Sequence, residues 1–136
     1  MSHLLEVKSI TKRFGGFTAL DAVNISVTKG ERLGLIGPNG SGKTTFINCL
    51  SGTMRNDSGV IKFEGGEISK LPAHRRIRLG IARSFQIPKP FTSMTVRENL
   101  LIPYEFGKQM SRSKGEHTPD GVLSLMGLDH KSDESA

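Results

Sequence analysis

Apolar and polar residues alternate in two stretches near the start of the chain. In residues 5–8 two apolar residues alternate with two charged ones, and residues 23–28 show the same period. A period of two is typical of an antiparallel strand with one buried face, so each stretch predicts a strand. Residues 12–17, which lie between them, are expected to form a turn that carries two aromatic residues.

Three other stretches predict strands without this alternation. Residues 32–36 form a nearly continuous apolar run, which is typical of a buried parallel strand. Residues 60–63 predict a short strand after a turn at 56–59. Residues 80–85 predict a further strand that ends at Gln86.

Helical signals follow each of these three strands. The apolar residues within 45–50 have helical spacing, and residues 72–78 are expected to form a short helix that opens at its proline. Thr95 and Glu98 have the spacing of a capping box, so another helix is expected to start there. Pro103 should kink or end that helix.

The last predicted helix starts at Thr118 and can end at Gly127. Its apolar residues are expected to face inward: Val122, Leu123, Leu125 and Met126. No apolar stretch approaches the ~20 residues that a membrane helix requires, and the start of the chain lacks the features of a signal peptide. We therefore expect a cytosolic chain, attached to a membrane only through partners.

Residues 37–44 have the pattern G-x-x-x-x-G-K-S/T, between the strand predicted at 32–36 and the helix predicted after it. Glycines allow backbone torsions that other residues avoid, so consecutive N–H groups can point at an anion. Lys43 adds a charge for the β- and γ-phosphates, and the Thr44 hydroxyl can join the shell of Mg²⁺. The predicted phosphate loop consists of Gly37, Pro38, Asn39, Gly40, Ser41, Gly42, Lys43, Thr44 and Thr45.

Composition narrows the classes of partner. The 136 residues are enough for one domain with a modest core, and the formal charge is +6. The positive residues are scattered except at 74–78, which we interpret as a solvated helix face. No aromatic residues are interleaved with that charge, so we expect no nucleic-acid partner. Cys49, the only cysteine, is expected to be a buried small hydrophobe, and it permits neither a disulfide nor a cysteine-based metal site.

The chain resembles the nucleotide-binding subunit of ATP-binding-cassette (ABC) transporters, and within that family it looks most like the branched-chain amino-acid uptake ATPases. The resemblance covers residues 4–129 and is strongest in G-P-N-G-S-G-K-T-T at 37–45 and in G-I-A-R-S-F-Q…M-T-V-R-E-N-L-L at 80–101. Uptake systems for urea or other amides look similar in the second motif. The resemblance implies an α/β P-loop NTPase fold, represented by its N-terminal portion. We expect an antiparallel β subdomain with the P-loop core at 1–92, the start of a helical subdomain at 93–130 and a polar tail at 131–136.

The resemblance also implies roles for single residues. Phe14 lies 29 residues before Lys43, where the family places an aromatic residue that stacks on adenine. Phe17 is a rival candidate, and Phe14 could instead only pack the turn. Gln86 matches a glutamine that reaches Mg²⁺ and the attacking water, so Lys43 and Gln86 are the expected catalytic residues and Thr44 and Gln86 the expected metal ligands.

The resemblance implies partners as well. Such ATPases bind ATP with Mg²⁺ between two cassette subunits, and the region after Gln86, here residues 87–106, receives the membrane permease. That arrangement would place the protein on the cytoplasmic face of the inner or plasma membrane through its permease.

The chain departs from the family pattern in three places. It has no run of four apolar residues followed by Asp-Glu, no L-S-G-G-Q signature and no switch histidine in the family's context. The sequence therefore looks like the N-terminal half of a cassette ATPase. Because phosphoryl transfer depends on positioning and electrostatics, we expect these 136 residues to bind ATP weakly, if at all, and not to hydrolyse it.

Three other functions are considered. A small soluble kinase or GTPase would need an N-K-x-D motif or an arginine-rich lid, and the chain has neither. A cassette ATPase of DNA repair or translation would carry long insertions or tandem cassettes. A non-catalytic nucleotide-binding module, or a decayed fragment without transport activity of its own, stays open as the alternative.

Overall fold

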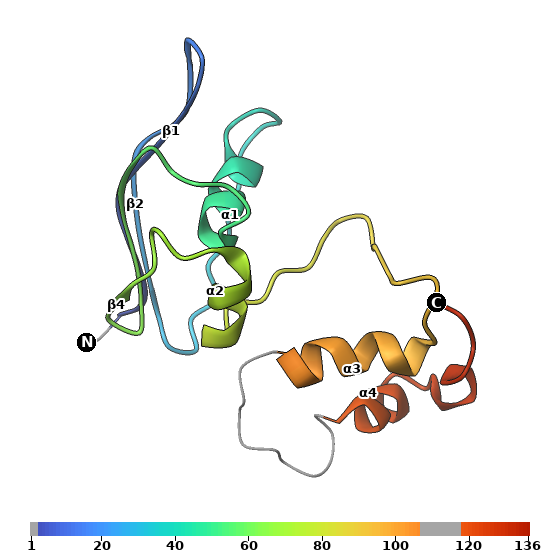
Figure 1. Cartoon of the computed structure of the whole chain (residues 1–136). Helices are drawn as coiled ribbons and strands as arrows, with labels where there is room; N and C mark the ends of the chain where they lie inside the picture. The colour runs from blue at the N-terminus through green and yellow to red at the C-terminus, as the bar shows by residue number, and fades with distance from the viewer. Residues whose placement is uncertain (1–2, 107–117) are drawn as a thin grey trace. The chain divides into compact units, whose positions relative to one another are not determined.

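The computed structural model describes residues 3–106 and 118–136 and divides into two compact units, Met1–Arg76 and Ile77–Ala136 (Figure 1). The first unit contains the sheet and the phosphate loop, and the second contains helices. The sequence-based division at residue 92 concerns the subdomains of the family and stays a prediction.

The first unit is built on a four-stranded antiparallel sheet with the order β2-β1-β3-β4. The strands predicted at 5–8, 23–28 and 60–63 are confirmed as parts of longer elements. The first two form one long hairpin around a two-glycine turn, so each continues well beyond its alternating stretch. The strands are β1 (His3–Phe14), β2 (Phe17–Thr28), β3 (Ser58–Phe63) and β4 (Gly66–Glu67).

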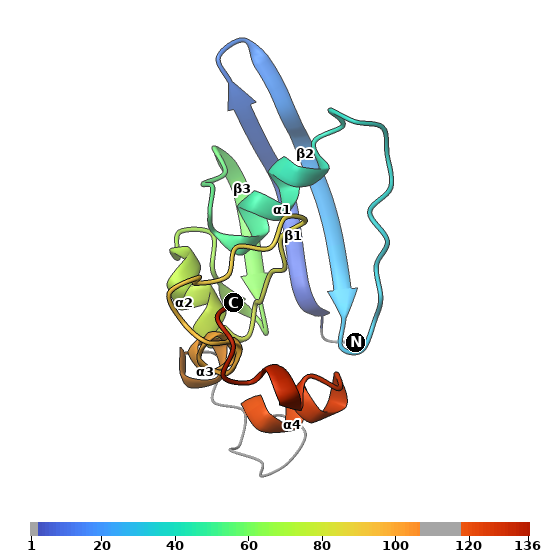
Figure 2. The ribbon, with the colours of Figure 1, turned by 90° about the vertical axis from the view of Figure 1, so that its right-hand side faces the viewer.

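Helix α1 (Lys43–Ser51) covers one face of this sheet (Figures 1 and 2). Residues that face each other across β1 and β2, such as Val7 with Ile25, belong to the same face, and this face holds the core. Cys49 is fully buried, as expected, and burial raises the pKa of its thiol. The buried apolar residues of the unit are Val7, Ile10, Leu20, Phe46, Cys49, Ile61 and Ile68.

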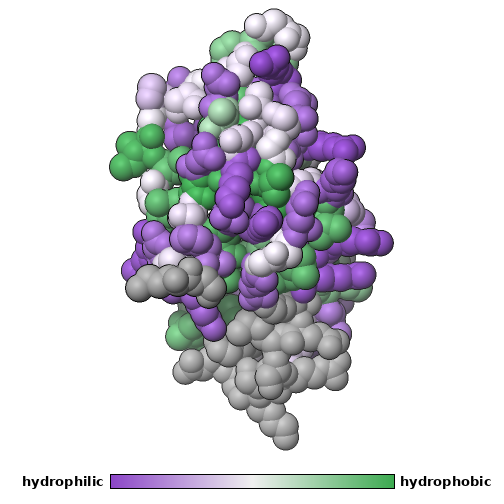
Figure 3. Space-filling view, turned by 90° about the vertical axis from the view of Figure 1, so that its left-hand side faces the viewer, coloured by the Kyte–Doolittle hydropathy of each residue, from purple (hydrophilic) through white to green (hydrophobic). Residues whose placement is uncertain are grey.

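The other face of the sheet is largely hydrophilic. Figure 3 shows purple side chains spread over it, with smaller green areas between them. In β2 the exposed Asn24 and Ser26 alternate with half-buried valine and isoleucine residues. The period of two therefore correctly predicts a strand with one buried face.

Two predicted strands are not strands in the structure. Residues 32–36 are extended without ladder partners, and among the residues described no strand lies hydrogen-bonded to them. Leu33, Leu35 and Ile36 are exposed, Ile36 to 96%. Residues 81–85 are likewise irregular, and Phe85 is exposed. A parallel strand is stabilised only by neighbours on its two edges, so an apolar run alone does not produce one.

Helix α2 (Ala73–Leu79) confirms the short helix predicted at 72–78. The prediction that its basic residues all face solvent is wrong for Arg76. Arg76 is 1% exposed, whereas its neighbours Arg75 and Arg78 are exposed. The charge pattern could not reveal this, because the groups that surround Arg76 come from α1 and from the loop after β4.

The second unit contains α3 (Val96–Phe106), α4 (Pro119–Leu125) and a 3₁₀ turn, η1 (Asp129–Lys131). The capping box is confirmed, since the Thr95 hydroxyl accepts from the Glu98 N–H at 3.2 Å and the Glu98 carboxylate accepts from the Thr95 N–H at 2.8 Å. Pro103 does not end α3, which continues for three more residues.

Helix α4 buries fewer residues than the sequence predicts. Leu123 is buried, but Leu125 and Met126 are 72% and 66% exposed. Leu125 lies about 200° around the helix from Leu123, so the two cannot share one face, and Met126 is already the C-cap of this short helix.

Candidate nucleotide-binding site

The phosphate loop joins the extended segment after β2 to the first turn of α1. Gly40 and Gly42 have φ values of 82° and 89°, a region that favours glycine. Gly37 does not have a positive φ, so the predicted torsional role is wrong there. A Cβ at Gly37 would lie 2.7 Å from the Ser41 Oγ, so a larger residue there would require the serine side chain to move.

Lys43 closes the loop on itself. Its Nζ donates to the carbonyl oxygens of Gly37 and Pro38, both at 2.6 Å, and to the Ser41 Oγ at 3.2 Å. The Ser41 N–H also bonds back to the Pro38 carbonyl at 3.3 Å. The ammonium group is therefore held inside the curve of the loop, where it can reach an anion bound there.

The N-terminus of α1 suits a phosphate group. Gly42 is its N-cap, no side chain caps it, and the first turn contains no acidic residue. The first helix-closing bond is donated by the Phe46 N–H to the Gly42 carbonyl at 2.8 Å. The N–H groups of the first turn, from Lys43 to Thr45, have no acceptor within the helix and point toward the positive end of its dipole. The Thr44 hydroxyl is exposed at this same end.

Gly42 also places the loop against the β1–β2 hairpin. A Cβ at Gly42 would lie 2.5 Å from the carbonyl oxygen of Ala19 and 3.1 Å from the Leu20 Cδ2, both in β2. Phe14 and Phe17 pair across the turn of this hairpin, and both side chains are exposed. The structure thus brings the loop and the aromatic hairpin into one unit.

Gln86 and the phosphate loop belong to different units. It lies exposed in the second unit, in the irregular segment before α3, while Lys43 and Phe14 lie in the first. Its expected contacts with Mg²⁺ and water stay a prediction.

Metal binding would depend on the nucleotide. Among residues 3–106 and 118–136, no cluster of three or more His, Cys, Asp or Glu side chains could hold a metal ion. Mg²⁺ is commonly bound through few protein oxygens together with substrate phosphates, and the Thr44 hydroxyl fits that role. The donor set of the loop therefore suits a magnesium–nucleotide complex better than a free metal ion.

Arg76 is a buried structural residue that the sequence did not reveal. Its guanidinium donates to four backbone carbonyls, those of Cys49, Leu50, Ser69 and Leu71, at 2.7–3.0 Å. The first two carbonyls belong to the last turn of α1, so Arg76 caps the phosphate-loop helix at its C-terminus. A side chain at Gly52 would collide with it, since a Cβ there would lie 2.8 Å from the Arg76 Nε.

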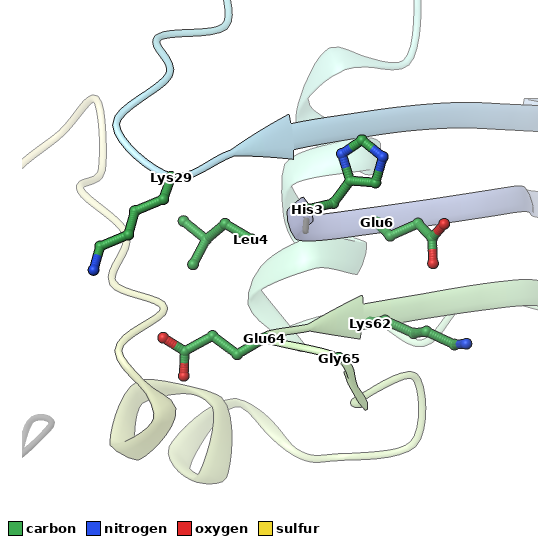
Figure 4. Close-up of a pocket in the computed structure, with 7 residues that line it drawn as sticks. All are labelled: His3, Leu4, Glu6, Lys29, Lys62, Glu64 and Gly65. Carbon is green, nitrogen blue, oxygen red and sulfur yellow. The ribbon is translucent and has the colours of Figure 1, made fainter. Parts of the chain in front are cut away.

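A hollow of about 560 Å³ lies at the end of the sheet, away from the loop residues. Figure 4 shows Leu4 between Lys29 and Glu64, with Glu6 and Lys62 pointing the other way. Acidic and basic side chains alternate around the hollow, and they point away from one another. The hollow therefore lacks the convergent positive groups that a phosphate would require.

A glycine-rich loop closed by a lysine, at the N-terminus of a helix that packs on a sheet, defines the class of P-loop nucleotide-binding proteins. The family model described as ABC transporter matches residues 20–136. The chain therefore belongs to the ABC transporter family of ATP-binding proteins.

Within this family, the chain is similar to ATP-binding proteins of branched-chain amino acid transport. The chain is 51% identical to the probable branched-chain amino acid transport ATP-binding protein LivG of Archaeoglobus fulgidus, over 98% of this chain and 56% of the relative. It is 46% identical to the high-affinity branched-chain amino acid transport ATP-binding protein BraF of Pseudomonas aeruginosa, over 73% of this chain and 39% of that protein. The chain thus spans about half the length of these relatives.

Solved structures agree with the fold. A crystal structure of an ATP-binding cassette of an ABC transporter in its ADP conformation superposes with a TM-score of 0.78 at 35% identity, covering 100% of this chain and 58% of that one. A nucleotide-free cassette gives a TM-score of 0.76 at 35% identity, covering 99% and 58%. The predicted fold class, a partial ABC-type P-loop NTPase, is confirmed, as is the relation to branched-chain amino-acid transport ATPases. No helix within the described parts of the chain has the length and apolar character needed to cross a membrane.

Proposed function

We propose that this chain is the ATP-binding part of an ABC importer subunit that energises branched-chain amino-acid uptake through a membrane permease. The single observation that carries the proposal is the loop geometry, in which Lys43 is held by three oxygen acceptors beside an uncapped helix N-terminus. The substrate class is supported by the relatives, which are described as branched-chain amino acid transport proteins.

Each loop residue has a task in this proposal. The first-turn N–H groups of α1 bind the phosphate oxygens, and Lys43 exchanges its carbonyl partners for the β- and γ-phosphates. The Thr44 hydroxyl contributes to the shell of Mg²⁺, which neutralises phosphate charge, and Thr45 supports the same end of the helix. Phe14 offers a ring face to adenine, while Phe17 is the alternative platform on the opposite strand.

The proposed partners are a second cassette subunit and a permease. The region after Gln86 supports permease docking because it carries exposed large apolar side chains, namely Ile87, Phe91, Tyr104 and Phe106. Exposed apolar groups of this size are typical of interaction surfaces. The protein would then act at the cytoplasmic face of the membrane, with Gln86 coupling nucleotide and permease.

A second candidate is a nucleotide-binding module without catalysis. The sequence of these 136 residues contains no Asp-Glu pair after an apolar run, so no carboxylate pair polarises the attacking water. We expect no steady phosphate release by this chain alone. Release above background that disappears in Lys43→Ala would contradict this expectation.

The proposed function is tested by thermal unfolding of the 136-residue chain with and without Mg·ATP. A ligand at 100 times its dissociation constant stabilises the native state by about 2.7 kcal/mol, so ATP should raise the unfolding temperature of the parent. Lys43→Ala should remove this rise. Lys70→Ala, which removes an exposed lysine after β4, is the matched control and should retain it. A cooperative transition that is indifferent to ATP would overturn nucleotide binding.

A further inference from the structure

Phe14 has two unequal ring faces. It is the last residue of β1, and its side chain is 46% exposed. The Lys12 Nζ lies over the ring, 5.6 Å from its centroid. A cation at this distance is attracted to the negative face of an aromatic ring. One face of Phe14 is therefore occupied by a group of the chain itself.

Lys12 is held in this position by Asp57. The Lys12 Nζ donates to the Asp57 Oδ1 at 2.8 Å, and only 16% of the lysine side chain is exposed. Its charge is already paired, so Lys12 is not available as a second phosphate-binding lysine. Its remaining interaction is with the ring.

Asp57 also fixes the backbone next to Phe14. The Arg13 N–H donates to the Asp57 Oδ2 at 2.7 Å, and the Asp57 N–H donates to the Thr11 carbonyl at 2.9 Å. The β1–β2 register shifts on both sides of Lys12, so the ladder with β2 is irregular here. One residue from the turn between α1 and β3 thus holds three consecutive residues of β1. The lysine and the Arg13 N–H hold the pKa of the Asp57 carboxyl below its ordinary value, as expected for a carboxylate with these partners.

We propose that Asp57 and Lys12 are positioning residues that fix the Phe14 ring, leaving one face available to the adenine base of a bound nucleotide. The inference rests on the proposed function, since it concerns the base-binding part of the same site. It explains why an exposed phenylalanine beside a two-glycine turn can serve as a platform: its orientation is set before the base arrives. A side chain that is already ordered loses less conformational freedom on binding.

The test compares a ligand that has a base with one that lacks it. Isothermal titration calorimetry gives the dissociation constants of Mg·ATP and of Mg·triphosphate for the 136-residue chain. In Asp57→Asn and Lys12→Met we expect ATP affinity to fall about two- to tenfold, while triphosphate affinity stays within about twofold of the parent. Lys12→Arg keeps both the ion pair and the cation over the ring, so its ATP affinity should equal that of the parent.

Two controls separate positioning from folding. Glu6→Gln removes another carboxylate–lysine pair of β1, also 2.8 Å long, and should leave both affinities unchanged. In the Phe14→Ala background, Asp57→Asn should have no further effect on ATP binding, because coupled residues are not additive. Thermal unfolding of each variant shows whether the chain is folded at the temperature of titration.

Each result has one meaning. Equal losses for ATP and triphosphate, or full additivity with Phe14→Ala, would overturn the positioning role and leave nucleotide binding intact. Unchanged ATP affinity in both Asp57→Asn and Lys12→Met would overturn it as well. If the parent binds triphosphate in a Lys43-dependent way but gains nothing from the base, the platform itself is wrong. If the parent binds neither ligand, the proposed function fails, and the positioning role fails with it.

Discussion

At the scale of single residues, the buried guanidinium of Arg76 stabilises the first unit. All four partners of Arg76 are backbone carbonyls, so its removal would leave buried acceptors at the end of α1 and in the loop before α2 without a donor. A local pattern of charges cannot distinguish it from Arg75, since both lie in the same basic stretch. The distinction arises from Cys49 and Leu50, more than twenty residues earlier in the chain.

Arg76→Met should therefore lower the free energy of unfolding by about 3 kcal/mol or more, since hydrogen bonds to charged groups and unsatisfied buried acceptors each cost on this order. Arg75→Met, the exposed neighbour, should change it by no more than about 0.5 kcal/mol. Urea unfolding followed by circular dichroism gives both values. Similar midpoints for the two variants would show that the Arg76 contacts contribute little.

Gly40 and Gly42 also differ at this scale. Both have a positive φ, but a Cβ at Gly40 would meet nothing within 4 Å, whereas at Gly42 it would meet the Ala19 carbonyl. Gly40→Ala should cost roughly 1–2 kcal/mol, from torsional strain alone. Gly42→Ala should cost clearly more, because the backbone of β2 must also move. Urea midpoints of the two variants decide the order, and a larger loss for Gly40→Ala would contradict it.

At the scale of elements, local signals predicted what local interactions form. The alternation in β2, the capping box of Thr95 and Glu98, and the start of α4 at Thr118 each depend on a few neighbouring residues, and each element is present. Residues 32–36 show the opposite case, because a parallel strand requires partner strands that its own sequence does not specify. The same holds for the site. The loop could be read from a motif, while the contacts of Asp57 with Lys12 and Arg13 span more than forty positions.

Helices α3 and α4 are joined by one exposed ion pair, which gives the second unit a pH dependence. The Arg97 Nε and Nη2 donate to the two carboxylate oxygens of Asp120 at 2.7 and 3.0 Å, and this lowers the pKa of Asp120. A carboxyl whose pKa is lower in the folded chain contributes stability above its unfolded value of about 3.9, and that contribution is lost as the pH falls through the folded value.

The difference in urea midpoint between the parent and Asp120→Asn should therefore be present at pH 6 and shrink below pH ~4 as the carboxyl becomes protonated. Because the pair is exposed, the difference should be small and should decrease further in high salt. A difference that is the same at pH 6 and pH 2.5 would mean that the ion pair is not its cause.

At the scale of the whole molecule, extended apolar segments remain uncovered in both units. Ile36 and Phe85 belong to segments that the sequence predicts as strands, and both side chains are exposed. An apolar segment that is exposed in this way is a site for strand pairing or for aggregation. The first unit is therefore held together by its antiparallel sheet and α1, where its buried apolar residues lie, and not by residues 32–36.

Hydrogen exchange should separate the two kinds of segment. We expect the amides of β1 and β3 to be strongly protected, because these two inner strands are hydrogen-bonded to each other around the buried Val7 and Ile61. Amides at 32–36 and 81–85 should exchange near the rate of an unstructured peptide. Protection of residues 32–36 in dilute solution would show that another strand pairs with them.

Because Cys49 is buried, its reaction with an alkylating reagent can be used to measure local opening of the first unit. It is the only thiol, it is inaccessible between α1 and the sheet, and burial makes its thiolate harder to form. An alkylating reagent can therefore react only when α1 lifts from the sheet, so the modification rate counts these openings under native conditions. A nucleotide that binds at the N-terminus of α1 should lower the alkylation rate of Cys49. Nucleotide binding could then be measured without an attached label.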